Sequence, residues 1–257
     1  EAVSERRTTL LEVRDVSKHF GGIYALNGAS LALENGEVHA LIGPNGAGKT
    51  TLIHVLSGAL RADAGQVIFD GNDLERRAMH ERVALGLARS YQITNLFSRL
   101  TVLDNVTMAV QSRVRDWGSS FSFWKPFSLD SAIVDEAHDL LAQVSLTGLA
   151  GRRAGQLSHG EQRCLEVALV LATKPKLLLL DEPMAGMGPE ESVRMVELIE
   201  HLARRVTMLL VEHDMDAVFR LADRISVLVG GRVIASDAPA AIRADLEVRR
   251  AYLGDAE

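Results

Sequence analysis

The chain has 257 residues, of which 47% are hydrophobic and 24% charged, a composition typical of a globular protein with a sizeable core. Its formal net charge of −6 argues against a nucleic-acid partner, because proteins that bind phosphate backbones usually carry a basic surplus. A single cysteine, Cys164, excludes an internal disulfide bond, and no apolar run is long enough to span a bilayer. The polar residues 1–9 do not have the pattern of a signal peptide. We therefore expect a soluble chain that reaches a membrane only through a partner.

The first ninety residues alternate strands and turns around one glycine-rich loop. Apolar and polar residues alternate over 10–16, which predicts a half-buried strand, and a short apolar run predicts a buried strand at Val38–Ile42. Two further strands are expected at Ala29–Leu33 and Gln66–Phe69. The stretch Thr50–Leu60 has helical periodicity. Strand, glycine-rich loop and helix, in that order, form the setting that a phosphate-binding loop requires.

The middle of the chain is predicted to be helical, and the last third returns to strands. Helical patterns cover 79–87, 103–110 and 131–144, and the turn-rich residues 113–130 separate the last two. After these come buried strands, a helix that starts at a proline, a hairpin with a Gly-Gly turn and a terminal helix. Their expected bounds are Leu177–Asp181 and Thr207–Glu212 for the strands, Pro189–Arg204 for the helix, Ile225–Val229 and Arg232–Ala235 for the hairpin, and Ala240–Leu253 for the last helix. This alternation predicts an α/β fold with a mostly parallel sheet.

The glycine-rich loop matches a phosphate-binding pattern over its whole length. Glycines let backbone N–H groups approach a polyphosphate closely, and the following helix points its positive end at the same charge. We expect Lys49 to reach the β- and γ-phosphates of a nucleotide and Thr50 to bind Mg²⁺. A chance glycine-rich turn is the alternative, and the strand before and the helix after the loop weigh against it. The loop residues are Gly43, Pro44, Asn45, Gly46, Ala47, Gly48, Lys49 and Thr50.

Two acidic residues follow the run of four leucines at 177–180. A carboxylate at the end of a buried strand is unfavourable unless a cation or a hydrogen-bond donor faces it. We therefore expect Asp181 to hold Mg²⁺ through water and Glu182 to polarise the attacking water. Two acids that cap a turn are the alternative, which the phosphate loop elsewhere in the chain disfavours.

A third motif points to a family. The sequence Leu157-Ser158-His159-Gly160-Glu161-Gln162 resembles the signature of ATP-binding-cassette (ABC) proteins, and the resemblance covers nearly the whole chain. It implies a P-loop NTPase (RecA-like) core with a mostly parallel sheet, an antiparallel β subdomain and an inserted α-helical subdomain. The expected single domain spans 10–257, with its core at about 10–88 and 165–238, its helical subdomain at about 89–164 and its C-terminal helix at about 240–253.

The resemblance also assigns roles to single residues. Phe20 matches the aromatic residue that stacks on adenine, with Tyr24 as a weaker rival. Gln92 matches a glutamine that joins the two lobes and touches Mg²⁺ and water, and His213 matches the switch histidine that contacts the γ-phosphate. The expected catalytic residues are Glu182, His213 and Gln92; the expected ATP contacts are Phe20, Ala25, Gly43, Pro44, Asn45, Gly46, Ala47, Gly48, Lys49, Thr50, Thr51, Ser158, Gly160 and Glu161; and the expected Mg²⁺ ligands are Thr50, Gln92 and Asp181.

Taken alone, each of these residues has a plainer interpretation. Phe20 would be core, Gln92 a surface amide, and His213 a residue at a strand end or a helix cap. Asp214 is expected to be the N-cap of the helix that follows it. Cys164 lies on an apolar helix face and is expected to be chemically inert.

Two positions depart from the family pattern. The signature usually has glycine where this chain has His159, so a side chain there can crowd the contact with the other subunit's nucleotide. The segment after Glu182 commonly ends in an aspartate that acts across the dimer. Here it reads Met184-Ala185-Gly186-Met187-Gly188-Pro189 and contains no acid, so the residue that usually acts across the dimer is absent from this segment.

The resemblance further implies a mechanism with several partners. Two cassettes, identical or different, pair head to tail, so that Ser158 and Gly160 of one close over the γ-phosphate held by Lys49 of the other. ATP then holds the two chains together until it is hydrolysed. The helical lobe grips membrane-spanning permease subunits, a periplasmic solute-binding protein acts indirectly, and no nucleic acid is involved. The chain is expected at the cytoplasmic face of the inner membrane as a peripheral protein.

Within the family, the chain is most similar to the importer ATPases for branched-chain amino acids and related solutes. The similar stretches are Phe20–Leu26, Glu212–Met215, the pair Ala185-Gly186 and Arg249–Gly254. Three alternatives stay open: an exporter ATPase of the lipopolysaccharide type, a soluble assembly ATPase of the iron–sulfur scaffold type, and a regulatory module without turnover. The presence of Glu182 and His213 argues against the last.

Overall fold

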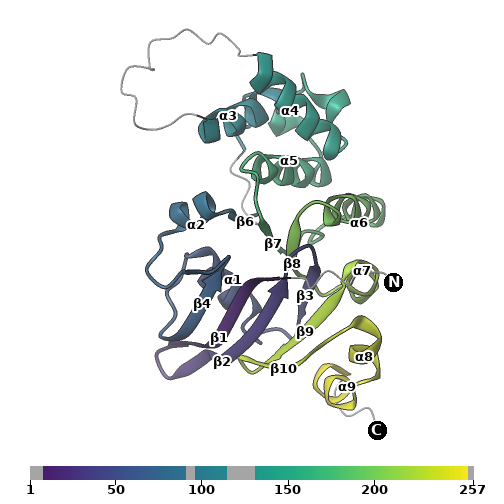
Figure 1. Ribbon diagram of the computed structural model, residues 1–257. Coiled ribbons are helices and arrows are strands. Elements are labelled where there is room, and N and C mark those ends of the chain that lie inside the picture. The colour runs from purple at the N-terminus through teal and green to yellow at the C-terminus, as the bar shows by residue number, and fades with distance from the viewer. Residues whose placement is uncertain (1–7, 91–95, 115–130, 254–257) are drawn as a thin grey trace, which may run out of the picture. The chain divides into compact units, whose positions relative to one another are not determined.

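A computed structural model describes residues 8–90, 96–114 and 131–253 of the chain (Figure 1). The described chain packs as two compact units. The first comprises the described residues within 1–89, 176–183 and 199–257, and the second comprises those within 90–175 and 184–198. The helical unit is larger than the expected helical subdomain, because it also includes 165–175 and 184–198. The division into a nucleotide-binding core and a helical subdomain stays a prediction.

The first unit contains an antiparallel sheet with the strand order β2-β1-β4-β5. A hairpin joins the long strands β1 (Thr9–Phe20) and β2 (Ile23–Glu34), in which Phe20 pairs with Ile23 beside the turn. The other edge of β1 pairs with β4 (Ala64–Phe69), and β4 pairs with the short strand β5 (Asn72–Asp73). The inward-facing residues of β1 and β2 alternate with outward-facing ones, as a half-buried sheet requires.

The first unit also contains a mostly parallel sheet with the order β10-β9-β3-β8-β7-β6. Strands β9, β3, β8, β7 and β6 run parallel, and β10 is antiparallel to β9. Every residue of β3, β7 and β8 is buried, which explains their continuous apolar sequences. The bounds are β3 (Val38–Ile42), β6 (Leu87–Arg89), β7 (Leu177–Asp181), β8 (Thr207–Val211), β9 (Arg224–Val229) and β10 (Arg232–Asp237).

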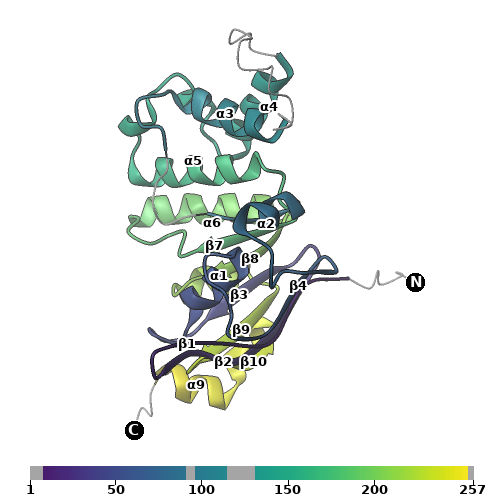
Figure 2. The ribbon, with the colours of Figure 1, turned by 90° about the vertical axis from the view of Figure 1, so that its left-hand side faces the viewer.

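Both faces of the parallel sheet are covered. The larger core lies between the two sheets and includes α1 (Lys49–Ser57), while α2 (Met79–Leu85) precedes β6. A smaller core on the opposite face joins Ala40 and Ile42 of β3 to α7 (Met215–Leu221), α8 (Pro239–Ala244) and α9 (Leu246–Leu253). Figure 2 shows α9 beside β10 in this unit. Leu41, between Ala40 and Ile42, points to the larger core, so β3 serves both.

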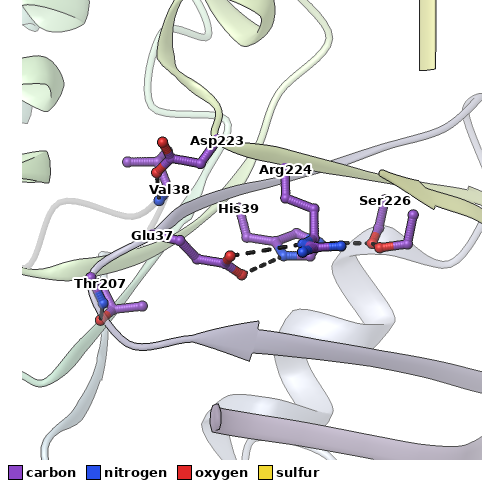
Figure 3. Close-up of polar contacts among 9 residues, drawn as sticks. Glu37, Val38, His39, Thr207, Asp223, Arg224 and Ser226 are labelled. Atoms are coloured by element: carbon purple, nitrogen blue, oxygen red, sulfur yellow. Dashed lines mark hydrogen bonds and ion pairs between the residues drawn. The ribbon is translucent and has the colours of Figure 1, made fainter. Parts of the chain in front are cut away.

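A buried polar network fixes the start of β3 (Figure 3). The Nδ1 atom of His39 lies 2.9 Å from Glu37 Oε1, and its Nε2 atom lies 2.7 Å from Ser226 Oγ on β9. Ser226 donates in turn to Ser236 Oγ of β10 at 2.8 Å. At the same end, the N–H of Val38 donates to the Asp223 carboxylate at 2.9 Å. The network therefore links β3, β9 and β10 near the start of β3. The glycine-rich loop follows the opposite, carboxyl end of β3.

The second unit is helical. Helices α3 (Val102–Val114), α4 (Ser131–Gln143) and α5 (His159–Leu171) pack against one another (Figures 1 and 2). Two short 3₁₀ turns, at Thr147–Leu149 and Ala154–Gln156, connect α4 to α5. Helix α6 (Pro189–Ala203) begins in this unit and ends in the first. Of the turn-rich insertion expected at 113–130, residues 113 and 114 end α3 and the others lie outside the described residues.

Two of the predicted helices were wrong. The helix expected at 79–87 ends at Leu85, because Gly86 adopts a left-handed backbone with φ of 101°, and Leu87–Arg89 is the edge strand β6. The helix expected at 240–253 is two helices, because Asp245 is extended and its carboxylate accepts hydrogen bonds from the N–H groups of Glu247 and Val248. Among the described residues, no helix has the length and apolar character needed to cross a bilayer.

Candidate nucleotide site

The glycine-rich loop leaves the carboxyl end of β3 and enters α1. Its tip residues Pro44, Asn45 and Gly46 are exposed, whereas Gly43 and Ala47 are buried. Gly48 has φ of 107°, and a Cβ atom there would collide with the backbone carbonyl of Ala25. Only glycine fits both constraints. Ala25, an expected contact of the nucleotide, therefore lies directly beside the loop.

Lys49 is the first residue of α1 and is buried. Its ammonium group donates hydrogen bonds to the carbonyl oxygens of Gly43, at 2.6 Å, and Pro44, at 3.1 Å. Burial lowers the pKa of Lys49, and the nearby charges of Glu182 and Asp181 oppose that decrease. The cation therefore lies inside the curve of the loop with two carboxylates close to it. Thr50, which is exposed, and Thr51 follow in the same turn of the helix.

Asp181 ends β7, and its carboxylate forms an ion pair with Arg89 of β6. The Arg89 Nη2 and Asp181 Oδ2 atoms are 2.8 Å apart, and the two side chains are 6% and 3% exposed. Strands β3, β8, β7 and β6 are parallel neighbours in that order. Arg89 and Asp181 end β6 and β7 and the glycine-rich loop follows β3, so all three lie at the carboxyl edge of the sheet. That edge is where open α/β sheets usually bind ligands.

Glu182 lies just beyond β7 in a backbone conformation that is uncommon for a side chain of this kind. Its φ is 48°, and its N–H donates to the Val211 carbonyl of β8 at 2.9 Å. Residues held in left-handed conformations are often found at functional sites, where the surrounding structure maintains them. The carboxylate is partly exposed, as a group that polarises water must be.

His213 follows β8 and has a side chain that is 66% exposed. The carboxylate of the buried Glu212 accepts a hydrogen bond from the His213 N–H at 3.0 Å and so fixes the backbone there. Asp214, not His213, caps α7, because its carboxylate accepts from the N–H groups of Asp216 and Ala217. The N-cap prediction for Asp214 is confirmed, and His213 is neither buried nor a helix cap.

Aromatic side chains are exposed at the β1–β2 turn. Phe20 is 51% exposed and Tyr24 is 60% exposed, so the interpretation of Phe20 as core is wrong. The Lys18 ammonium lies 5.6 Å from the centre of the Phe20 ring, and His19 packs against Tyr24. An exposed ring of this kind is suited to stacking on a nucleobase.

The signature motif begins α5 in the second unit. Ser158 is the N-cap, its Oγ accepts from the Glu161 N–H at 3.3 Å, and Glu161 accepts in return from the Ser158 N–H at 2.7 Å. This capping box places the Ser158 hydroxyl and the buried Gly160 backbone in the first turn. Cys164 lies on the same helix, and burial raises the pKa of its thiol to about 11, which supports the prediction that it is inert.

Comparison with known proteins identifies the family. The sequence profile described as "ABC transporter" matches residues 26–185, and one described as "Branched-chain amino acid ATP-binding cassette transporter" matches 232–257. The chain is an ATP-binding cassette of the ABC transporter family. This confirms the α/β fold class and makes the chain an ATPase subunit of a transporter.

Relatives match the cassette over almost its whole length. It is 37% identical over 251 residues to the high-affinity branched-chain amino acid transport ATP-binding protein BraF of Pseudomonas aeruginosa, with 96% of this chain and 98% of that protein covered. Identity and coverage are the same for LivG of Escherichia coli K12, a protein with the same description. A crystal structure of an ABC transporter's ATP-binding cassette in its ADP conformation superposes with a TM-score of 0.83 at 30% identity, covering 96% of this chain and all of that one.

The structure reveals two further residues beside predicted site residues, one in each unit. Arg89 in the first unit pairs with Asp181, and the signal for it in the sequence is an arginine in an apolar segment, which needs a carboxylate partner when it is buried. Glu191 accepts hydrogen bonds from Ser158 and Gly160 in the second unit. Of the predicted site residues, Gln92 lies outside the described residues, and the others are placed as reported above.

Proposed function

We propose that this cassette hydrolyses ATP to power the uptake of branched-chain amino acids or a related small solute. The observation that carries the proposal is the buried Lys49 ammonium, which lies within the glycine-rich loop and interacts with the charges of Glu182 and Asp181. A cation so placed, beside backbone N–H groups and two carboxylates, suits a polyphosphate and its metal ion. The relatives named for branched-chain amino acid transport support the choice of solute.

Each residue of the site has a proposed part in the reaction. Lys49 binds the terminal phosphates, and Thr50 and Asp181 hold Mg²⁺, which supplies charge neutralisation when it is bound. Glu182 accepts a proton from the attacking water, and His213 holds the γ-phosphate. The exposed Phe20 ring supports the adenine. The pairing of Asp181 with Arg89 supports the metal role, since this buried carboxylate already faces one cationic side chain at 2.8 Å.

The proposal extends to the assembly. Two cassettes pair head to tail, and Ser158 and Gly160 of one contact the γ-phosphate held by Lys49 of the other. The helical subdomain docks on permease subunits, with a solute-binding protein acting from the opposite side, and the cassette lies at the cytoplasmic face of the inner membrane. A dimeric cassette structure bound to ADP and phosphate shares the fold, with a TM-score of 0.74 at 24% identity, so this arrangement is compatible with the fold.

Uptake of labelled solute tests the proposal. A strain that lacks this gene is complemented with the wild type, with Lys49→Ala, or with Lys174→Ala as a control at an exposed lysine. Wild type and control are expected to restore uptake of ¹⁴C-leucine, whereas Lys49→Ala is not. Competition by unlabelled valine, isoleucine and unrelated amides then defines the solute. Suppose instead that the strain without this gene takes up the solute normally, while the purified chain still hydrolyses ATP. That result would support a soluble assembly ATPase.

A further inference from the structure

The carboxylate of Glu191, in the first turn of α6, lies over the start of α5. Its Oε1 atom accepts a hydrogen bond from the Ser158 hydroxyl at 3.1 Å and another from the Gly160 N–H at 3.2 Å. A Cβ atom on Gly160 would lie 2.8 Å from the Glu191 carboxyl group, so the carboxylate covers this backbone. All three residues belong to the second unit.

This carboxylate is stabilised as an anion. The hydrogen bonds from Ser158 and Gly160, with a further one from the Gly188 N–H at the start of α6, lower the pKa of Glu191, although burial opposes the decrease. Arg194 adds a nearby positive charge. Glu191 therefore receives backbone N–H groups from the first turns of two helices, which are the ends that favour negative charge.

The donors have no capacity left for a second anion. A serine hydroxyl has one proton, and that of Ser158 is donated to Glu191, while its oxygen already accepts from Glu161. The Gly160 N–H likewise has a single hydrogen, which points at the same carboxylate oxygen. An oxyanion that binds to Ser158 and Gly160 must therefore displace Glu191.

We propose that Glu191 is an internal substitute for the phosphate and restrains ATP-dependent pairing of the cassettes. The inference rests on the proposed function, in which Ser158 and Gly160 contact the γ-phosphate held by the other chain. In the unpaired chain Glu191 occupies these donors. When the second chain presents its terminal phosphate, which carries more negative charge than a carboxylate, Glu191 is expelled and the two anions repel one another. Glu191 thereby raises the ATP and protein concentrations that pairing requires.

A merely structural role makes the opposite prediction. If Glu191 served to hold Ser158 and Gly160 in a binding-competent position, its loss would weaken pairing. Because glutamine keeps the shape and a hydrogen-bond acceptor but removes the charge, Glu191→Gln separates the two roles. Glu190 provides the control, since it is the adjacent, exposed glutamate of the same turn, and Glu190→Gln changes the net charge equally.

The test is the MgATP-dependent dimerisation of the full chain, measured by analytical ultracentrifugation in a Glu182→Gln background so that ATP persists. Glu191→Gln and Glu191→Ala are expected to lower the dimer dissociation constant by roughly three- to thirty-fold, because they remove a competing charged acceptor. Glu190→Gln is expected to leave it nearly unchanged. Thermal unfolding of the nucleotide-free chains checks that each variant folds.

The outcomes are distinguishable. An unchanged or weaker dimer for Glu191→Gln would overturn the inference, and so would an equal gain for Glu190→Gln, which would reveal an effect of net charge alone. Failure of the proposed function would look different. In that case MgATP would produce no dimer of any variant, including Glu182→Gln alone, even where a fluorescent ATP analogue binds the single chain.

Discussion

The Nη2 atom of Arg89 lies 2.8 Å from Oδ2 of Asp181, in a pair whose side chains are 6% and 3% exposed. Removing either partner of such a pair strongly destabilises the fold, because it leaves the other charge buried without compensation. The charge of Arg89 also acts on His54, whose pKa is lowered by burial and then by Arg89. Arg89 thus holds the carboxylate that is proposed to bind Mg²⁺.

Replacing Arg89 with methionine should therefore destabilise the cassette. We expect the free energy of unfolding to fall by roughly 3 kcal/mol, measured by urea denaturation without nucleotide. Because bound Mg²⁺ supplies positive charge to Asp181, the deficit should shrink when MgATP is added. The conservative change Arg89→Lys should cost less. A deficit of the same size with and without MgATP would contradict the proposed metal role of Asp181.

Glu182→Gln should separate binding from hydrolysis. The side chain is partly exposed and keeps its shape, so the dissociation constant for ATP should change little. The rate of hydrolysis should fall by roughly 10²- to 10⁴-fold, because the acceptor of the water proton is lost. Single-turnover assays and equilibrium binding measure the two quantities separately. Normal turnover by this variant would exclude Glu182 as the base.

Much of the site is predictable from local sequence. The bounds of β3 and β7 match the predicted ones, because a buried apolar run that ends in a glycine-rich loop or in two acidic residues is a local signal. The N-cap role of Asp214 is equally local. For these positions the three or four neighbouring residues largely determine the backbone.

The missed features depend on contacts between distant segments. Arg82 looks like a surface residue in the sequence, yet it is 5% exposed and donates to the carbonyls of Val55, Leu56 and Leu74. Nothing near Arg82 in the sequence encodes those acceptors. The pairing of Arg89 with Asp181 joins residues 92 positions apart, and it requires that β6 be recognised as a strand beside β7. Periodicity does not reveal strand order, because that order depends on the tertiary packing.

Phe20 and Tyr24 are two candidates for the adenine contact, and substitution of each ring distinguishes them. We expect Phe20→Ala to raise the dissociation constant for ATP by roughly three- to tenfold, because it removes one stacking face. Tyr24→Ala should have a smaller effect. Neither change should alter the melting temperature much, since both rings are more than half exposed. Stacking tolerates any base, so GTP should lose affinity in parallel. A larger loss for Tyr24→Ala would assign the adenine to that ring.

The buried network at the start of β3 predicts a pH dependence of stability. Burial alone would raise the pKa of Glu37, but the hydrogen bond with His39, one from the Glu34 backbone and the charges of His39 and Arg224 together lower it below the ordinary value of 4.5. A folded-state pKa below the unfolded one means that the ionised Glu37 stabilises the fold above about pH 4.5. That contribution is lost as the pH falls through the folded-state pKa.

Glu37→Gln should accordingly lower the free energy of unfolding by roughly 1–3 kcal/mol at pH 7, because it removes a charged partner of a buried histidine. The difference from the wild type should stay constant down to about pH 4.5 and then shrink as the pH is lowered further, since the wild type alone loses the contribution of Glu37. Urea denaturation between pH 3.5 and 7.5 measures both curves. Glu197→Gln, at an exposed glutamate, is the control and should follow the wild type throughout. A gap for Glu37→Gln that widens in acid would show that Glu37 is not the ionised partner in this network.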